Sequence, residues 1–221
     1  MNLDEFKLYS LGIDKEKFGK IYAFVDFGNV NYWYEKDVRD AQNNILSKNQ
    51  KLIVDIEKLS EFLNLFSEKK LFYYGWNSRI KSSWHIVIKA EKNGFVKITK
   101  PIQFIRHYLD GIEIAKNNTP FIKKDADGKS FIEIPKSNFD VEISVDSVRF
   151  LDEYDTFCLL SGDSDFAYLI EFLKKKRKKI IVIASGQVFH TIKDNADLYI
   201  NAQSVKNCIT SIKNSAQKGG V

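Results

Sequence analysis

The chain has 221 residues, of which 44% are hydrophobic and 29% charged, and its formal net charge is +5. This length is enough for one domain with a full hydrophobic core, and the sequence contains no internal repeat or low-complexity block. The composition excludes a disulfide-rich scaffold, and no stretch approaches a membrane span. The small basic excess is compatible with a polyanionic partner but does not demonstrate one.

The two cysteines indicate a reducing environment. Cys158 and Cys208 follow no paired metal spacing, and Cys158 lies in an apolar run typical of a core strand. Residues 1–18 are rich in acids and lysines and contain no apolar signal segment. We therefore expect a cytoplasmic protein with no membrane partner.

Apolar runs typical of strands alternate with helical patterns along the chain. The expected strands cover residues 20–30, 70–76, 95–105, 156–160 and 179–185. The expected helices cover residues 53–68, 81–94, 140–152 and 165–178. This alternation predicts an α/β fold with a doubly wound, mostly parallel five-stranded sheet and helices on both of its faces. We expect the strand order 3-2-1-4-5.

Residues 111–137 interrupt this alternation. Two strand-like runs, IEIAKNNTPFIKK and KSFIEIP, lie on either side of Asp127-Gly128, which is a favourable hairpin turn. The segment DADGKS superficially resembles a calcium loop, but Lys136 stands where an acid would be needed. The segment therefore predicts a β-hairpin insertion. The predicted organisation is an N-terminal extension at 1–18, a single domain at 19–204 with this insertion, and a C-terminal helix or tail at 205–221.

Carboxylates follow two of the expected strands. Asp26 ends the first strand, and Asp163 and Asp165 follow the fourth in the segment LLSGDSDF. Ligands of doubly wound sheets bind beyond the carboxyl ends of the strands, where the strand order reverses. Because strands one and four are neighbours in the expected order, these three acids share one crevice. Asp140 can reach the same crevice from the first turn of its helix.

Helix capping is the simpler explanation of these side chains. Ser161, Asp163 or Ser164 can cap the helix that follows, and an acid in the first turn suits the helix dipole. Capping requires neither Gly162 nor a second aspartate beside the first. Two close carboxylates repel each other unless a cation or a proton lies between them, which favours a functional role.

Three segments resemble the motifs of the NYN-domain family, including its LabA-like branch, which belongs to the PIN-like nucleases. They are FVDFGNVNYW, FDVEISVDSVRF and LLSGDSDFAYLIEFL. A fourth segment, GQVFHTIKDNADLYIN, resembles the closing segment of the family, in which Ala-Asp precedes the last strand. The resemblance implies a PIN-like parallel sheet, an acidic site that binds magnesium or manganese, and hydrolysis of RNA phosphodiester bonds.

The resemblance also implies which residues form the site. Matched to the family motifs, the acids of the site are Asp26, Asp140, Asp163 and Asp165, with Asn29 beside them and Asp146 as a second acid of the same helix as Asp140. The family often has Lys-Gly before the acid that matches Asp140. Here Asn138-Phe139 stand at that place and Lys136 is displaced, so the role of a lysine is left open.

The chemistry of these side chains agrees with the resemblance. Hard divalent cations take oxygen ligands, and magnesium uses one or two carboxylates together with waters and substrate phosphates. A metal among Asp26, Asp140 and Asp163 can activate a water and neutralise charge developing on a phosphate. Asp165 can hold a second metal or orient the water. The neutral Asn29 and Ser161 can position these groups, or act only in turns and caps.

Other residues offer contacts to RNA. The rings of Tyr32 and Trp33 follow Asn29 closely and either stack unpaired bases or pack in the core. Lys176 and Arg177, in the run KKKRKK, either contact phosphates or form a solvated helix end. The three histidines have no zinc-ligand spacing.

We predict a metal-dependent endoribonuclease that acts on single-stranded RNA. The alternative is a non-catalytic RNA- or protein-binding module on the same fold. A phosphatase of the haloacid-dehalogenase type is discounted because it needs an acid two residues after its nucleophile, and Gly28 stands at that distance from Asp26. The sequence leaves the oligomeric state open, a dimer included.

Overall fold

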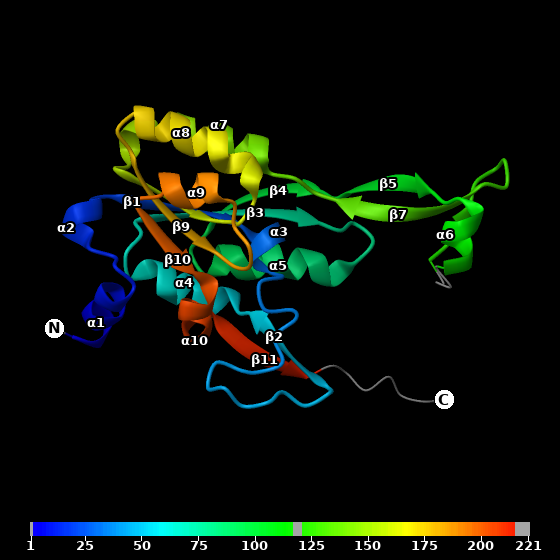
Figure 1. Ribbon diagram of the computed structural model, residues 1–221, viewed down its shortest axis with the longest axis horizontal. Helices are drawn as coiled ribbons and strands as arrows, with labels where there is room; N and C mark the ends of the chain where they lie inside the picture. Colours follow the sequence, from blue (N-terminus) through cyan, green and yellow to red (C-terminus); the bar gives the residue numbers. More distant parts are fainter. Residues whose placement is uncertain (1, 117–120, 215–221) are drawn as a thin grey trace.

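A six-stranded parallel sheet forms the centre of the protein (Figure 1). The computed structural model describes residues 2–116 and 121–214. Across the sheet, the strands are β10 (Leu198–Asn201), β9 (Lys179–Ala184), β8 (Thr156–Leu160), β1 (Ile21–Asp26), β3 (Lys69–Trp76) and β4 (Val96–Pro101). Each strand pairs in parallel with its neighbour, so all six carboxyl ends lie at the same edge.

The expected strand order is confirmed, and the expected strand count is wrong. The five expected strands correspond to β1, β3, β4, β8 and β9, which lie in the order β4-β3-β1-β8-β9. β10 adds a sixth strand outside β9 and is the last strand that the family resemblance implies. Its four residues pair with one strand only, and such a short segment gives no periodic signal of its own.

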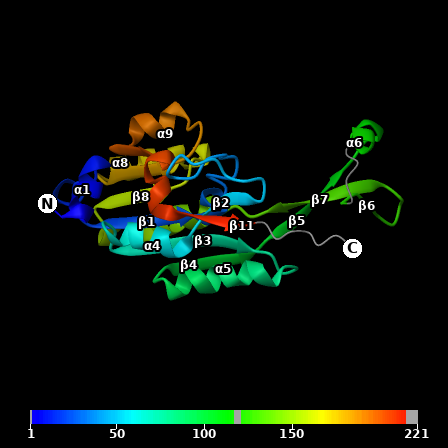
Figure 2. The ribbon, with the colours of Figure 1, turned by 90° about the horizontal axis from the view of Figure 1, so that it is seen from below.

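Helices cover both faces of the sheet (Figures 1 and 2). One face packs against α3 (Phe27–Val30), α4 (Ile56–Asn64), α5 (Lys81–Lys92) and α10 (Lys206–Ile209), together with residues of α1 (Leu3–Ser10) and α2 (Lys15–Phe18). The other face packs against α7 (Asp140–Arg149), α8 (Ala167–Lys175) and α9 (His190–Asn195). Three single turns of 3-10 helix complete the body, at Leu151–Glu153, Ser164–Phe166 and Ala202–Val205.

Alternating side chains of β1 contribute to the two cores. Ala23 and Val25 face the first core, whereas Tyr22 and Phe24 face the core under α7 and α8. Successive side chains of a strand point to opposite faces. Asp26 therefore follows Phe24 on the face that α7 covers.

The helix expected at 53–68 begins three residues late. Its first residues belong to β2 (Gln50–Val54), which pairs antiparallel with β11 (Thr210–Asn214). Asp55 then caps α4 by accepting a hydrogen bond from the backbone N–H of Glu57. The partner strand lies more than 150 residues away, so no local pattern indicates β2. The expected C-terminal helix or tail contains α10 and β11, and residues 215–221 lie outside the described part of the chain.

The insertion is an arm that projects from the body (Figure 2). It is a three-stranded antiparallel sheet of β5 (Gln103–Tyr108), β7 (Ser130–Lys136) and β6 (Lys123–Lys124). The third expected strand therefore divides at Ile102 into β4 of the body and β5 of the arm. The hairpin of β6 and β7 is as expected, and Gly128 in its turn has a φ of 78°.

The strand expected over IEIAKNNTPFIKK is wrong for its first part. Gly111–Lys116 form the helix α6, and residues 117–120 lie outside the described part of the chain. Asp110 caps this helix by accepting hydrogen bonds from the N–H groups of Ile112 and Glu113. None of the helices in the described part of the chain is long and apolar enough to cross a membrane.

Candidate metal centre

Asp26 lies where β1 ends, between the neighbouring strands β8 and β3. Its Oδ2 accepts a hydrogen bond of 3.0 Å from Ser161 Oγ, at the end of β8. Its Oδ1 accepts one of 3.3 Å from the backbone N–H of Asn29, which caps α3. The parallel pairing of Val25 with Leu160 places Asp26 beside Ser161. Sheet register therefore joins two residues that are far apart in the sequence.

Asn29 ties the loop after β1 to the loop after β8. Its Oδ1 accepts a hydrogen bond of 2.9 Å from Trp33 Nε1, and the backbone N–H of Gly162 points to the same oxygen at 3.4 Å. The side chain of Asn29 thus contacts both loops, and its supporting role at the site stays a prediction.

Three carboxylates converge next to Asp26. One oxygen each of Asp140, Asp163 and Asp165 lies within 4.8 Å of the other two. Asp140 begins α7, and its backbone N–H donates to Asn138 Oδ1 at 2.8 Å. Asp163 Oδ1 accepts a hydrogen bond of 3.1 Å from the N–H of Asp165. Asp163 is therefore a helix cap as well as a member of the cluster, so capping explains one bond and leaves the convergence unexplained.

Burial and mutual repulsion raise the pKa of two of these acids. Burial raises the pKa of Asp26 to about 6, and the charges of Asp140 and Asp163 add to this rise, against the hydrogen bonds from Ser161 and Asn29. Burial also raises the pKa of Asp140, with further contributions from Asp163 and Asp165, against Asn138 and Lys100. The arrangement concentrates negative charge that a cation would relieve.

Comparison with known proteins agrees with this geometry. The NYN domain family matches residues 20–204. The chain belongs to the NYN-domain family. It is 32% identical over 75 residues to the low amplitude and bright protein LabA of Synechococcus elongatus, which supports the LabA-like branch. That match covers 34% of this chain and 40% of LabA, so the chain spans less than half the length of this relative.

A solved structure supports the fold. The NYN domain described here is similar to the crystal structure of a protein of unknown function from Vibrio parahaemolyticus, with a TM-score of 0.57 and 20% sequence identity. The similarity covers 87% of this chain and 96% of that one. The likeness concerns the α/β fold, which is consistent with a PIN-like architecture.

Lys100 lies near the acids of the NYN domain, although the sequence patterns did not indicate it. Lys100, near the end of β4, donates a hydrogen bond of 2.6 Å to Glu142 Oε1 on α7 and lies 4.5 Å from the ring centre of Phe139. Its charge lowers the pKa of Asp140. The family often has Lys-Gly before the acid that matches Asp140, whereas the structure brings a lysine near Asp140 from β4. Lys100 lies in the middle of the strand expected at 95–105, so no local pattern pointed to it.

Asp146 lies apart from the three converging carboxylates. Its Oδ2 accepts a hydrogen bond of 3.0 Å from the hydroxyl of Tyr73, and Arg149 lies 3.9 Å from its Oδ1. The first contact joins α7 to β3, and the second lies within α7. They favour the structural alternative, in which Asp146 pairs with a polar or basic neighbour.

The expected RNA-binding residues differ in how far they are exposed to solvent. Tyr32 is 60% exposed, whereas Trp33 is only 8% exposed and packs in the core, so the expectation of a stacking role for Trp33 is wrong. Lys136 is exposed at the end of β7, four residues before Asp140.

Lys176 and Arg177 lie at the edge of the sheet opposite to the acids, so they cannot contact a phosphate bound there. They stand just before the first residue of β9, and Arg177 lines a hollow with Phe18 and Gly19, which precede β1. Both therefore lie at the amino edge. A helix that returns across a parallel sheet ends at the edge opposite to its start, so the basic run at the end of α8 is separated from the acids by the length of the strands.

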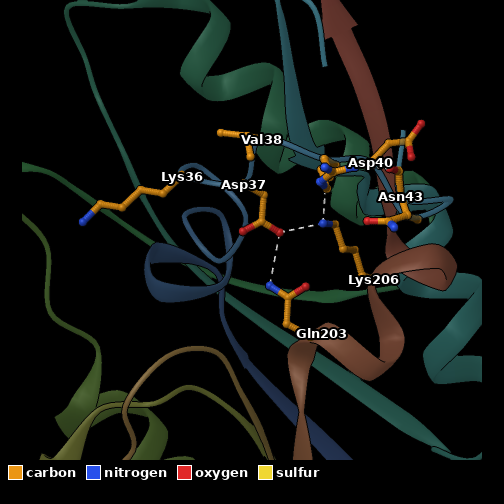
Figure 3. A pocket seen from close by; sticks show the side chains of 9 residues that line it. Lys36, Asp37, Val38, Asp40, Asn43, Gln203 and Lys206 are labelled. Atoms are coloured by element: carbon orange, nitrogen blue, oxygen red, sulfur yellow. Dashed lines mark hydrogen bonds and ion pairs between the residues drawn. The ribbon is translucent and has the colours of Figure 1, made fainter. Parts of the chain in front are cut away.

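The hollow shown in Figure 3 lies elsewhere, and its Lys206 is already paired. Its volume is about 540 Å³, and it is lined by residues 36–41 with Asn43, Gln203 and Lys206. Lys206 Nζ lies 2.7 Å from Asp37 Oδ2 and donates to the carbonyl of Arg39 at 2.7 Å. Gln203 donates to the same Asp37 oxygen at 3.1 Å. These side chains satisfy one another, so we base the functional site on the acids.

Proposed function

We propose that this NYN domain is a metal-dependent ribonuclease that hydrolyses RNA phosphodiester bonds. The observation that carries the proposal is the convergence of Asp140, Asp163 and Asp165, with Asp26 beside them, at the carboxyl edge of a doubly wound sheet. This edge is where such folds bind their ligands. We propose Asp26, Asp140, Asp163 and Asp165 as the metal-binding and catalytic residues.

The residues present fit magnesium or manganese. All the candidate ligands are carboxylate oxygens, which hard divalent cations prefer. One oxygen each of Asp140, Asp163 and Asp165 lies within 4.8 Å of the other two, so the three carboxylates already face one shared volume in which a cation would be held. When bound, the cation would supply charge neutralisation at the phosphate and activation of a water.

The residues of the chain have separable roles in this proposal. Asp140, Asp163 and Asp165 hold the cation. Asp26 presents oxygens fixed by Ser161 and by the backbone of Asn29. Asn29 keeps the two loops together. The substrate then needs no deep pocket, because a phosphodiester reaches an open edge of the sheet directly.

The experiment that tests the proposal measures cleavage of single-stranded RNA with manganese and with chelator. Wild type should cut only with metal. Asp163→Asn keeps the shape of the side chain and its cap, but removes one metal-binding charge, and should abolish cleavage while leaving much of the RNA binding. Asp127→Asn, in the exposed turn of the arm, is the matched control and should cut at the wild-type rate.

The alternative is a non-catalytic RNA- or protein-binding module on the same fold. RNA binding by wild type without any metal-dependent cleavage would favour it. If Asp163→Asn cuts RNA at the wild-type rate, Asp163 is excluded from the mechanism.

A further inference from the structure

Exposed aromatic rings follow three neighbouring strands at the edge that carries the acids. Tyr32 comes after β1 and is 60% exposed, Tyr168 comes after β8 and is 79% exposed, and Phe189 comes after β9 and is 66% exposed. β9, β8 and β1 are adjacent in the sheet. A single exposed ring is ordinary on a protein surface. Three rings in the segments that follow three adjacent strands form a pattern at one place.

The backbones that carry Tyr32 and Phe189 belong to linked loops. Ser185 Oγ, in the loop after β9, donates a hydrogen bond of 3.2 Å to the backbone carbonyl of Trp33. The buried Trp33 in turn donates to Asn29. The loops after β1 and β9 are therefore joined through residues that also position the acid site.

The loop that carries Phe189 lies directly against the acid-bearing turn. A Cβ placed on Gly162 would lie 3.5 Å from the carbonyl oxygen of Ser185 and 3.6 Å from Val188 Cγ2. Val188 and Ile192 are buried on either side of Phe189. They hold the backbone in place while the ring of Phe189 faces solvent, one loop away from Asp163.

Tyr168 stands on the other side of the acids in the chain. It follows Asp165 by three residues, which is about one helical turn. Its neighbours Leu169 and Ile170 are buried and fix the start of α8 in the core. The ring of Tyr168 points outward from a rigid element.

We propose that Tyr32, Tyr168 and Phe189 stack the unpaired bases on either side of the phosphate held at the acid cluster. The placement of the three rings along the substrate rests on the proposed function, which puts the phosphate at the acid cluster. Rings separated by polar groups suit a strand of bases and phosphates better than a continuous apolar protein surface. Bases of a duplex are already stacked on one another, so the rings select single-stranded RNA.

The test measures binding separately from cleavage. A labelled single-stranded RNA is titrated, by fluorescence anisotropy in the presence of chelator, into wild type and into Tyr32→Ala, Tyr168→Ala and Phe189→Ala. Base stacking on one ring contributes about tenfold in affinity. Each substitution should therefore weaken binding by about tenfold, whereas Tyr168→Phe, which keeps the ring, should bind like wild type.

A matched control comes from the opposite edge of the sheet. Tyr9 is 76% exposed, nearly as much as Tyr168, and lies on α1. The helix is followed by Gly12, which approaches Leu198 at the first residue of β10 and so at the amino edge. Tyr9→Ala should leave RNA binding unchanged. Binding of the corresponding duplex should be weaker and insensitive to all of these substitutions.

The outcomes separate this inference from the proposed function. If the three alanine variants lose RNA binding, the stacking rings are supported. If wild type also binds RNA but does not cut it, the nuclease is overturned. Wild-type RNA affinity in the three variants would overturn the stacking rings, whether or not the protein cuts. A wild type that neither binds nor cuts RNA would overturn both. Equal affinity for single-stranded RNA and duplex would overturn the selectivity.

Discussion

Ser161 connects Asp26 to Asp163 through one hydroxyl group. Its Oγ donates a hydrogen bond of 3.0 Å to Asp26 Oδ2 and accepts one of 3.3 Å from the backbone N–H of Asp163. The hydroxyl thus satisfies the carboxylate of Asp26 and the backbone N–H of Asp163 without adding charge. The buried position of Ser161 makes this linkage rigid. The geometry of the acids is therefore set before any ligand binds.

Without metal, the charge of Asp26 should destabilise the folded state. The pKa of Asp26 rises from 3.8 to about 6 on folding. Below pH 3.8 the carboxyl is protonated in both states, and no cost arises. As pH rises through 6, the unfolded carboxyl is already ionised, and ionising the folded one costs up to about 3 kcal/mol, which lowers the free energy of unfolding.

Asp26→Asn should remove this cost. In chelator, the variant should be more stable than wild type at pH 8 and should differ least from it at pH 4. Urea denaturation at both pH values measures the difference. A variant that is less stable than wild type at pH 8 would show that the hydrogen bonds of Asp26 outweigh its burial.

Manganese should stabilise the wild-type protein. A ligand that binds only the folded state at a hundredfold excess over its dissociation constant stabilises by about 2.7 kcal/mol. For a chain of this size, that corresponds to a rise of about 5–10 °C in Tm. Asp163→Asn should respond weakly, because one ligand charge is lost. A wild-type Tm that does not change at saturating manganese would favour the binding module.

Tyr73→Phe should cost stability and leave cleavage intact. The substitution removes the hydrogen bond to Asp146 Oδ2, and a hydrogen bond to a charged group contributes about 1.5–3 kcal/mol. Because Asp146 lies outside the carboxylate cluster, metal-dependent cleavage at a temperature well below Tm should stay within about twofold of wild type. A large loss of cleavage in a folded variant would place Asp146 in the mechanism.

Lys100→Met should tighten manganese binding and weaken RNA binding. The ammonium group lies close enough to lower the pKa of Asp140, so it also opposes a metal cation at the same acids. Its removal leaves Glu142 unpaired, which adds negative charge beside them. The manganese concentration for half-maximal stabilisation should fall several-fold at low salt, and this difference should shrink at high salt as charges are screened. Lys100→Arg, which keeps the charge, is the control.

The amino-acid sequence was enough to predict the alternation of strands and helices, the order of the five long strands and the four candidate acids. Buried strands such as TFCLL are read from composition, and parallel strands bring their carboxyl ends to one edge. Asp26 and Asp163 could therefore be placed together before their distance was known. The family resemblance assigned Asp140 to the site, which helix geometry alone only allowed.

The neighbours of these residues could be learned only from the folded chain. β2 pairs with β11 and β10 pairs with β9 through contacts between distant segments, and neither short strand has a pattern of its own. Lys100 reaches Glu142 on α7 from β4, and the indole of Trp33 is buried while the ring of Tyr32 is exposed. Local patterns specify which face of an element is apolar. They do not specify which distant segment covers that face, because this depends on packing of the whole chain.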